Sequence, residues 1–173
     1  MFKFLKKKHF FDEWKATSSV VSPFVPELGK IGEVKLGDRI DRLACMGRPH
    51  DYKQADKGRY SLEYPGLTVE CEDGFLTYIG CMFGSVEVRT VDGRPVGSGL
   101  SVEQVMDLYG APDKDDTEDA DDIVFTYTRN GIVVEFEFGG WRGLLRVNCF
   151  RVDSTYNTAE RIARPRRSAK RSP

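Results

Sequence analysis

Six short stretches of the chain alternate hydrophobic with polar residues, and this period of two predicts β-strands. A short turn sequence separates the first two stretches of each half, Pro65-Gly66 in one and Arg129-Asn130-Gly131 in the other. Such turns favour hairpins, so each half is predicted to form three antiparallel strands. The six predicted strands are residues 59–64, 67–72, 75–83, 122–128, 132–138 and 143–150.

A short helical pattern precedes each group of strands, at residues 38–49 and 101–112. Apolar residues recur there at three- and four-residue spacing, and Asp38 and Ser101 are suitable N-caps. Gln104 lies three residues after Ser101, which predicts a capping box there. Each pattern ends at a glycine followed by a proline, because glycine accepts a left-handed turn and proline cannot continue a helix. The residues predicted to end the helices are Gly47, Pro49, Gly110 and Pro112.

Alternation gives every predicted strand one apolar side and one polar side. The apolar sides include Tyr64 and Tyr127, and we expect them to pack against the helices. The opposite side is mostly acidic and is expected to face water. Its charged and polar residues are Arg59, Glu63, Glu70, Glu72, Glu135, Glu137, Arg146 and Asn148.

The two halves read as two copies of one unit, in which Tyr64 aligns with Tyr127 and Gly66 with Gly131. One copy of about 60 residues would bury a single layer and leave a sheet edge open. We therefore expect an α+β fold of two tandem α-β-β-β repeats, with short helices packed on one face of a continuous antiparallel sheet. The predicted divisions are an N-terminal basic segment and loop (1–35), the first repeat (36–84), a linker (85–98), the second repeat (99–152) and a basic disordered tail (153–173).

A capped short helix ending in Gly-x-Pro, followed by a tyrosine-bearing strand and an amphipathic hairpin, resembles the SmpA/OmlA (BamE-like) module. The tandem arrangement over residues 36–152 is similar to the beta-lactamase inhibitor protein superfamily, in which two such modules form one curved sheet. The resemblance implies protein binding rather than substrate turnover. The family's outer-membrane lipoproteins carry a signal peptide and a lipid-attached cysteine, and we expect neither here. The structural roles that it implies are helix stops at Gly47, Pro49, Gly110 and Pro112, and strand markers at Tyr64 and Tyr127.

Composition favours a soluble chain, and no motif indicates a cofactor. Of its 173 residues 40% are hydrophobic, and no apolar run is long enough to suggest a membrane span. The basic start resembles a secretory signal, but Asp12, Glu13 and Lys15 interrupt it before any cleavage site, so a cytoplasmic location is expected. The cysteines lie too far apart for a zinc motif, which predicts reduced thiols and no metal. They are Cys45, Cys71, Cys81 and Cys149.

Charge is segregated along the chain, although the net charge is only −1. Residues 1–8 carry four lysines, and residues 161–173 carry six basic residues and no acid. Residues 9–160 contain the remaining 16 basic residues and all 27 acids, so that part carries a formal charge of −11. The basic ends could bind phosphates or an anionic surface, or could simply aid solubility, and the first could instead dock on the body as a short amphipathic helix.

Catalytic arrangements are weakly indicated. His50 beside Asp51 could belong to a catalytic triad, but no nucleophile elbow accompanies it, and a turn histidine is the simpler interpretation. Glutamate pairs at i and i+2 could divide acid and base roles in a hydrolase, yet this spacing more simply places them on a wet sheet face. We therefore expect a protein that is not an enzyme.

The strongest charge feature is residues 113–122, with seven acids in ten positions. An EF-hand loop needs glycine at its sixth position and glutamate at its twelfth, and counting from Asp113 gives Glu118 and Val124. A looser cation site and a solvated acidic loop both stay open as interpretations.

The leading hypothesis is a non-catalytic protein-binding module, of the immunity or inhibitor type, whose acidic sheet face and 113–122 loop attract a basic protein. Trp141, at a predicted hairpin tip, would either anchor that partner or fold back onto the core. The alternative is a structural or scaffold protein whose basic ends bind an anionic membrane or nucleic acid; no small-molecule substrate is evident. The residues predicted to bind the partner are Glu70, Glu72, Glu135, Glu137, Arg146, Trp141, Asp115, Asp116 and Asp119.

Overall fold

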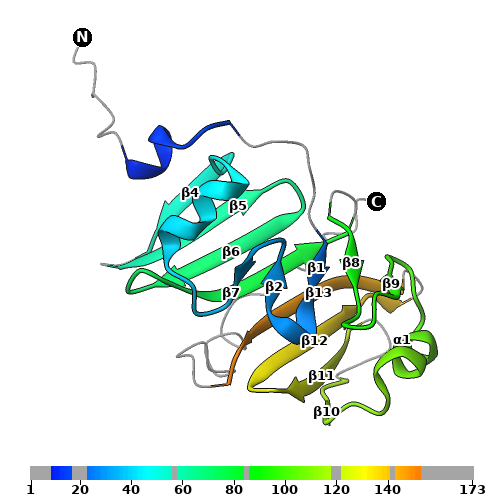
Figure 1. Cartoon of the computed structure of the whole chain (residues 1–173). Helices are drawn as coiled ribbons and strands as arrows, with labels where there is room; N and C mark the ends of the chain where they lie inside the picture. Colours follow the sequence, from blue (N-terminus) through cyan, green and yellow to red (C-terminus); the bar gives the residue numbers. More distant parts are fainter. Residues whose placement is uncertain are drawn as a thin grey trace, which may run out of the picture.

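The computed structural model has the mixed α and β composition predicted from the sequence, with far more strand than helix (Figure 1). Its helices are three 3-10 helices and one α-helix among the described residues: η1 (Phe10–Glu13), η2 (Pro26–Leu28), η3 (Ile40–Met46) and α1 (Val102–Tyr109). The structure describes residues 9–16, 23–55, 58–83, 86–117, 122–140 and 143–152.

The larger of two sheets is antiparallel and eight-stranded, in the order β10-β11-β12-β13-β7-β6-β5-β4. All six predicted strands are present, and each half gains one additional edge strand. The pairing of β13 with β7 joins the two halves, so the expected continuous antiparallel sheet is observed. The strands are β4 (Asp51–Gln54), β5 (Arg59–Tyr64), β6 (Leu67–Glu72), β7 (Phe75–Met82), β10 (Lys114–Asp115), β11 (Ile123–Arg129), β12 (Ile132–Phe138) and β13 (Leu144–Arg151).

The two hairpin turns follow the chemistry of their residues. Tyr64 pairs with Leu67 across Pro65-Gly66, and Gly66 has φ +71°. In the second hairpin Arg129 pairs with Ile132, and Asn130 and Gly131 have φ values of +52° and +76°. A turn with positive φ at both central residues matches the twist of the two strands in a hairpin. Asparagine followed by glycine adopts this turn readily.

The two predicted helices form, although by different hydrogen-bond patterns. The capping box predicted at Ser101 is present, because Gln104 N–H donates to Ser101 Oγ at 3.3 Å and Ser101 N–H donates to Gln104 Oε1 at 2.9 Å. The first helix is a 3-10 helix with Arg39 at its N-cap, so the prediction of Asp38 as N-cap is wrong. Asp38 instead accepts a hydrogen bond from Lys35 N–H, which closes the preceding turn.

Both helices end at the predicted glycines, and a strand tyrosine binds each of these ends. Gly47 and Gly110 have φ values of +86° and +81°. The Tyr64 hydroxyl donates to the Gly47 carbonyl at 3.3 Å, and the Tyr127 hydroxyl donates to the Gly110 carbonyl at 3.0 Å. Each bond spans 17 residues of the chain. These bonds satisfy helix-end carbonyls that have no partner within their helix.

A second sheet, of five strands in the order β3-β2-β1-β8-β9, was not expected. Its strands lie in the segments interpreted as an N-terminal loop and a linker, and β1 pairs with β8 in parallel through Phe24 and Val88. Each strand has only two residues, which is too short for alternation to be recognised in the sequence. They are β1 (Phe24–Val25), β2 (Lys30–Ile31), β3 (Val34–Lys35), β8 (Val88–Arg89) and β9 (Pro95–Val96).

The second sheet and the helices cover the same face of the large sheet. Figure 1 shows η3 lying across β5 and β6, while β1, β2 and β8 lie in front of β13 and β12. One hydrophobic core cluster joins these layers, and it includes Phe24 and Val88 of the small sheet together with Val69 and Val134 of the large one. The apolar face of the large sheet is therefore shared between η3, α1 and the small sheet.

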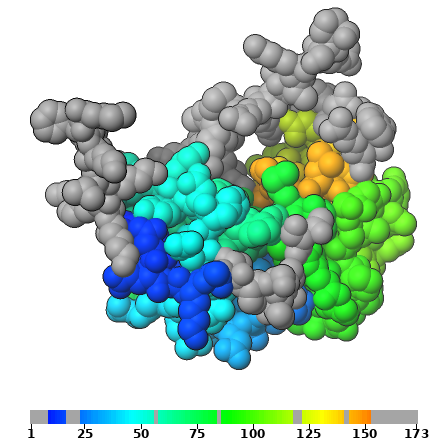
Figure 2. Space-filling view, turned by 90° about the horizontal axis from the view of Figure 1, so that it is seen from above, coloured from blue at the N-terminus to red at the C-terminus, as the bar shows by residue number. Residues whose placement is uncertain are grey.

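The segment from His9 to Ala16 docks at the β4 end of the molecule. Phe11 is fully buried, and the His9 ring stacks on it at 4.4 Å and contacts Tyr52 at 5.0 Å. Arg48 N–H donates to the Lys15 carbonyl at 2.7 Å, which fixes the segment beside η3. Figure 2 shows this blue segment against the cyan residues, at the opposite end of the molecule from the green residues around α1. The docked interpretation thus holds for residues 9–16.

Within the described part of the chain, no helix has the length and apolar character that a membrane crossing requires.

Replacing Tyr64 or Tyr127 by phenylalanine should lower the free energy of unfolding by about 1 kcal/mol each, because a hydrogen bond to a helix-end carbonyl is lost, which is buried for Tyr64 and partly buried for Tyr127. Urea denaturation followed by circular dichroism measures this. Tyr52→Phe is the control, since the ring contacts of Tyr52 with His9 and Phe11 survive the change. Equal stability of all three variants and the wild type would show that these hydroxyls do not hold the helix ends.

Candidate functional site

The candidate site is the outer face of the large sheet, which is the face turned away from the helices and the small sheet. Cα pairing places Glu135 opposite Asn148, Asn148 opposite Gly80, and Gly80 opposite Thr68. The face therefore has a central stripe on β7 and β13, with acidic residues on the neighbouring strands β12 and β6. The stripe comprises Tyr78, Gly80, Met82, Arg146, Asn148 and Phe150, and its borders comprise Glu135, Glu137, Glu70 and Glu72.

A chain of side-chain hydrogen bonds crosses three strands at the centre of this face. The Tyr78 hydroxyl donates to Asn148 Oδ1 at 2.7 Å, and Asn148 Nδ2 donates to Glu137 Oε1 at 2.5 Å. Arg146 Nη1 lies 3.5 Å from the other oxygen of Glu137. Tyr78 and Asn148 are buried, so hydrogen bonding is required to offset the loss of their hydration. The network fixes Glu137 and Arg146, which are partly exposed, in defined positions.

Gly80 allows this network to form. A Cβ atom at Gly80 would lie 2.8 Å from Cζ of Tyr78, because the tyrosine ring leans over the glycine to reach Asn148. A contact this close requires the ring to move. Glycine is therefore needed here for the close approach of a neighbouring ring, and its φ is not in the left-handed region.

The two acidic borders are separated by the width of the stripe. Three interstrand spacings separate β12 from β6, a distance of about 14 Å. Arg59 Nη2 lies 3.3 Å from Glu72 Oε1 on the β6 side, as Arg146 lies beside Glu137 on the β12 side. Each border thus combines carboxylates with one arginine. The exposed side chains of Met82 and Phe75 add apolar surface on β7.

Two residues of the predicted wet face are buried. Glu135 has 7% of its surface exposed and Asn148 has none, so the expectation that this face is uniformly solvated is wrong. Alternation sets the side of the sheet on which a residue lies, and it does not set how deeply neighbouring side chains cover it. Glu70, Glu72 and Glu137 are partly exposed and lie where the sequence predicted.

Within the described residues 113–117, the acids of the acidic segment do not extend the candidate site. Asp115 pairs with Phe125, whose side chain lies on the apolar side of the sheet, so Asp115 projects away from the outer face. Lys114 Nζ lies 2.7 Å from Asp116 Oδ2, and Asp113 Oδ2 accepts a hydrogen bond from Thr128 N–H at 2.6 Å. The strand β10 forms one edge of the sheet and is separated from β6 by four other strands. These acids bind their own neighbours at the sheet edge.

Two predicted binding residues, Trp141 and Asp119, lie outside the described residues. Among the residues that the structure describes, no group of three or more histidine, cysteine or acidic side chains could hold a metal ion.

The remaining candidates for chemistry have ordinary local partners. Asp51 accepts a hydrogen bond from Tyr52 N–H at 2.9 Å and His50 N–H donates to the Glu63 carbonyl, so both belong to the start of the β4–β5 pairing. Burial raises the pKa of the Cys71 and Cys81 thiols to about 12, which keeps them protonated and unreactive at neutral pH.

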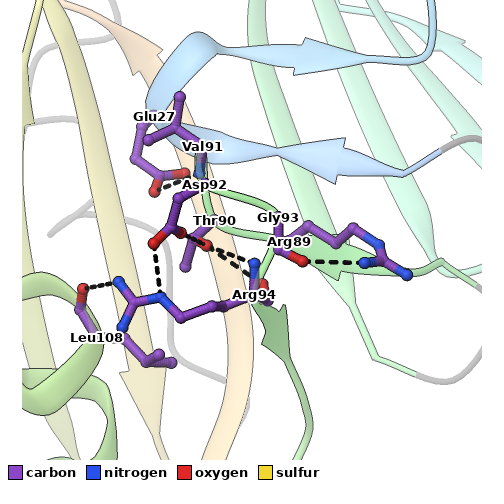
Figure 3. Close-up of polar contacts among 8 residues, drawn as sticks. All are labelled: Glu27, Arg89, Thr90, Val91, Asp92, Gly93, Arg94 and Leu108. Atoms are coloured by element: carbon purple, nitrogen blue, oxygen red, sulfur yellow. Dashed lines mark hydrogen bonds and ion pairs between the residues drawn. The ribbon is translucent and has the colours of Figure 1, made fainter.

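A second polar cluster, which the sequence did not reveal, connects η2, the β8–β9 turn and α1 (Figure 3). Glu27 Oε1 accepts a hydrogen bond from Val91 N–H at 3.1 Å. Arg94 Nε donates to Asp92 Oδ2 at 2.8 Å, and its Nη2 donates to the carbonyl of Leu108 near the end of α1 at 3.1 Å. The turn is thereby held to both η2 and the α-helix.

Glu27 is an acid held in an apolar setting. It has 9% of its surface exposed, and burial raises the pKa of its carboxyl above the ordinary 4.5. Its Oε2 and the buried Tyr109 hydroxyl lack a hydrogen-bond partner of normal geometry. Burial, followed by the proximity of Glu27, raises the pKa of Tyr109. The hydrogen bonds of Glu27 and Arg94 join η2, the β8–β9 turn and α1, and we assign the cluster a role in stability.

Sequence reasoning identified the acids of the outer face and missed the groups that order them. Tyr78 lies in a predicted strand, but a bulge between Glu70 and Cys71 changes which residues of β7 share a face. Glu27 lies between Pro26 and Leu28 in a segment interpreted as loop, where neither period nor motif marks a buried acid. The signal that was available is Gly80, because a glycine inside a strand often marks the close approach of another group.

Comparison with known proteins finds one distant structural likeness and no related sequence. No protein-family model matches the chain, and no curated protein matches it. Among solved structures the chain is similar to a DUF4309 family protein (YjgB) from Bacillus subtilis subsp. subtilis str. 168. The TM-score is 0.49 at 16% sequence identity, and the alignment covers 70% of this chain and 84% of that one. A likeness at this level carries no argument about the fold or the function of this chain.

Gly80→Ala should destabilise the protein by about 1–3 kcal/mol, because the new methyl group displaces the Tyr78 ring from its hydrogen bond with Asn148. Urea denaturation measures the loss. Gly97→Ala is the matched control, since no atom lies within 4 Å of its Cβ position and its φ is not left-handed. If the two variants were equally stable, the ring would not depend on the glycine.

Glu27→Gln should stabilise the protein increasingly as the pH rises. Because burial raises the pKa of Glu27 in the folded state, its contribution is fully present below the unfolded pKa of about 4.5 and is lost as the pH rises through the folded pKa. Glutamine keeps the acceptor for Val91 N–H and carries no charge. Unfolding free energies of both proteins from pH 4 to pH 8 test this. A difference between them that does not change with pH would contradict it.

Proposed function

We propose that the protein is a non-catalytic protein-binding module, of the immunity or inhibitor type, whose outer sheet face binds a basic segment of a partner protein. The observation that carries the proposal is the arrangement of that face, in which two acidic borders about 14 Å apart flank a central stripe bearing tyrosine, methionine and phenylalanine. A strand-like or extended segment fits between such borders with basic side chains toward either one.

The charge of the molecule supports a basic partner. Residues 9–160 carry a formal charge of −11, and the partly exposed acids Glu70, Glu72 and Glu137 concentrate negative charge on the outer face. Charge complementarity of this kind speeds encounter and selects the partner, while desolvated apolar groups supply most of the affinity. Met82, with 57% of its surface exposed, is the apolar group available on the stripe.

The order of the site also supports binding. Tyr78, Asn148 and Glu137 form one hydrogen-bonded unit on central strands, so the surface is preorganised on rigid elements. A preorganised surface loses less conformational entropy when a partner binds. The proposal includes no catalytic step and no cofactor, and its subcellular setting stays the cytoplasm predicted from the sequence.

We further infer that the two halves derive from one repeated α-β-β-β unit of the SmpA/OmlA (BamE-like) kind. Supporting this, the hydroxyls of Tyr64 and Tyr127 bind Gly47 and Gly110 across the same 17-residue separation. Tyr64 pairs with Leu67, which pairs with Cys81; Tyr127 pairs with Val134, which pairs with Cys149. The correspondence requires a second hairpin longer by two residues in each strand, so Gly66 and Gly131 are not equivalent as first aligned.

The alternative function, in which basic ends bind an anionic membrane or nucleic acid, falls on residues 1–8 and 153–173, which lie outside the described residues. It stays a prediction, as does the membership of the beta-lactamase inhibitor protein superfamily.

The proposal predicts that the full chain binds a fluorescently labelled octa-arginine peptide. The double variant Glu70→Gln with Glu72→Gln should bind this peptide about tenfold more weakly, because two surface charge interactions are lost. Fluorescence anisotropy at low and high salt measures the affinity. Added salt should weaken binding because the pairs are exposed.

The matched control is Glu33→Gln with Asp41→Asn, which removes the same charge from exposed positions in the β2–β3 turn and in η3, on the covered side of the sheet. Binding by the control variant should equal that of the wild type. Equal weakening in both variants would show attraction to net charge alone and would overturn the assignment of the outer face.

A further inference from the structure

The outer face has a candidate occupant within the same chain. β13 is a central strand and ends at Arg151, and Val152 N–H donates to the Gly131 carbonyl at 3.0 Å. The described part of the chain therefore ends at the β11–β12 turn, beside the start of β12. Residues 161–173 hold six of the chain's basic residues and no acid.

We propose that the basic segment 153–173 binds across the acidic outer face of its own chain, so that a partner must displace it. This rests on the proposed function, because it assigns an occupant to the same surface. The charges are complementary, with the carboxylates of Glu70, Glu72 and Glu137 on the face and the arginines of the segment opposite them.

The segment is long enough to reach both borders. Pairing places Glu70 level with Phe150 and Glu137 level with Arg146, so these carboxylates are offset by about 14 Å along the strands as well as by about 14 Å across them. The nine residues from 153 to 161 span up to about 30 Å when extended, which exceeds the resulting diagonal of about 20 Å. Covalent attachment gives the segment an effective concentration of about a millimolar at the face, so weak exposed charge pairs are sufficient for occupancy.

The other basic end is less suitable. Residues 9–16 dock on Tyr52 and Tyr60, which pair with Leu62 and Cys71 and so lie on the apolar side of the sheet. His9, where the described chain begins, therefore lies on the side that carries the helices, whereas Val152, where it ends, directly follows β13.

The test uses the full chain with a nitroxide spin label on Ser168→Cys in a Cys45→Ser background, since Cys45 is the exposed one of the four cysteines. We expect loss of amide NMR signals on the outer-face residues of β6, β7, β12 and β13, and none around Glu33 and Asp41. The loss should disappear at high salt, and also when Arg164, Arg166 and Arg167 are replaced by glutamine.

Signal loss spread evenly over both faces, or confined to the helix-bearing face, would overturn the proposal. So would outer-face signal loss that persists unchanged in the glutamine variant. The two proposals can fail separately. If the segment does not bind the outer face, octa-arginine can still bind the full chain, and Glu70→Gln with Glu72→Gln can still weaken that binding. If the proposal holds, octa-arginine should bind more tightly to the tail-neutralised variant than to the wild type.

Discussion

The pairing of β7 with β13 is the contact on which the rest of this structure depends. Each half of the large sheet would otherwise end in an open edge with unpaired backbone groups. Five residue pairs join the strands, and Ile79, Cys81, Val147 and Cys149 contribute fully buried side chains to the core from this junction. Burial of these side chains removes apolar surface from water at the centre of the molecule, where both halves contribute.

The polar side of the same junction fixes its register. Asn148 lies opposite Gly80, and the hydroxyl of Tyr78 reaches Asn148 only in this alignment. A slip of one residue would turn Asn148 toward the apolar core, where its amide would lack partners. The hydrogen-bond chain that orders the candidate binding surface thus also selects the pairing that creates the sheet. Stability and the proposed binding face arise from one arrangement of residues.

The second layer is built from pieces far apart in the chain. β1 to β3 and β8 to β9 form a small sheet over the core, and Glu27 and Arg94 bind the β8–β9 turn to η2 and α1. This layer closes the apolar side, so that the outer face is the side left to carry charge. The buried acid Glu27 contributes a pH-dependent cost to this layer, whereas Glu72 and Glu137 of the outer face are partly exposed and lie beside Arg59 and Arg146.

The sequence by itself determined the elements whose signals are local: the six long strands, the Asn130-Gly131 turn, the capping box at Ser101 and the helix ends at Gly47 and Gly110. It also placed Glu70, Glu72 and Glu137 on one face, because alternation along a strand assigns sides. Only the tertiary structure decided the small sheet, the burial of Glu135 and Glu27, and the contact between Tyr78 and Asn148, which lie 70 residues apart. These depend on which distant segments pack together, and two-residue strands and single buried acids leave no periodic trace in a sequence.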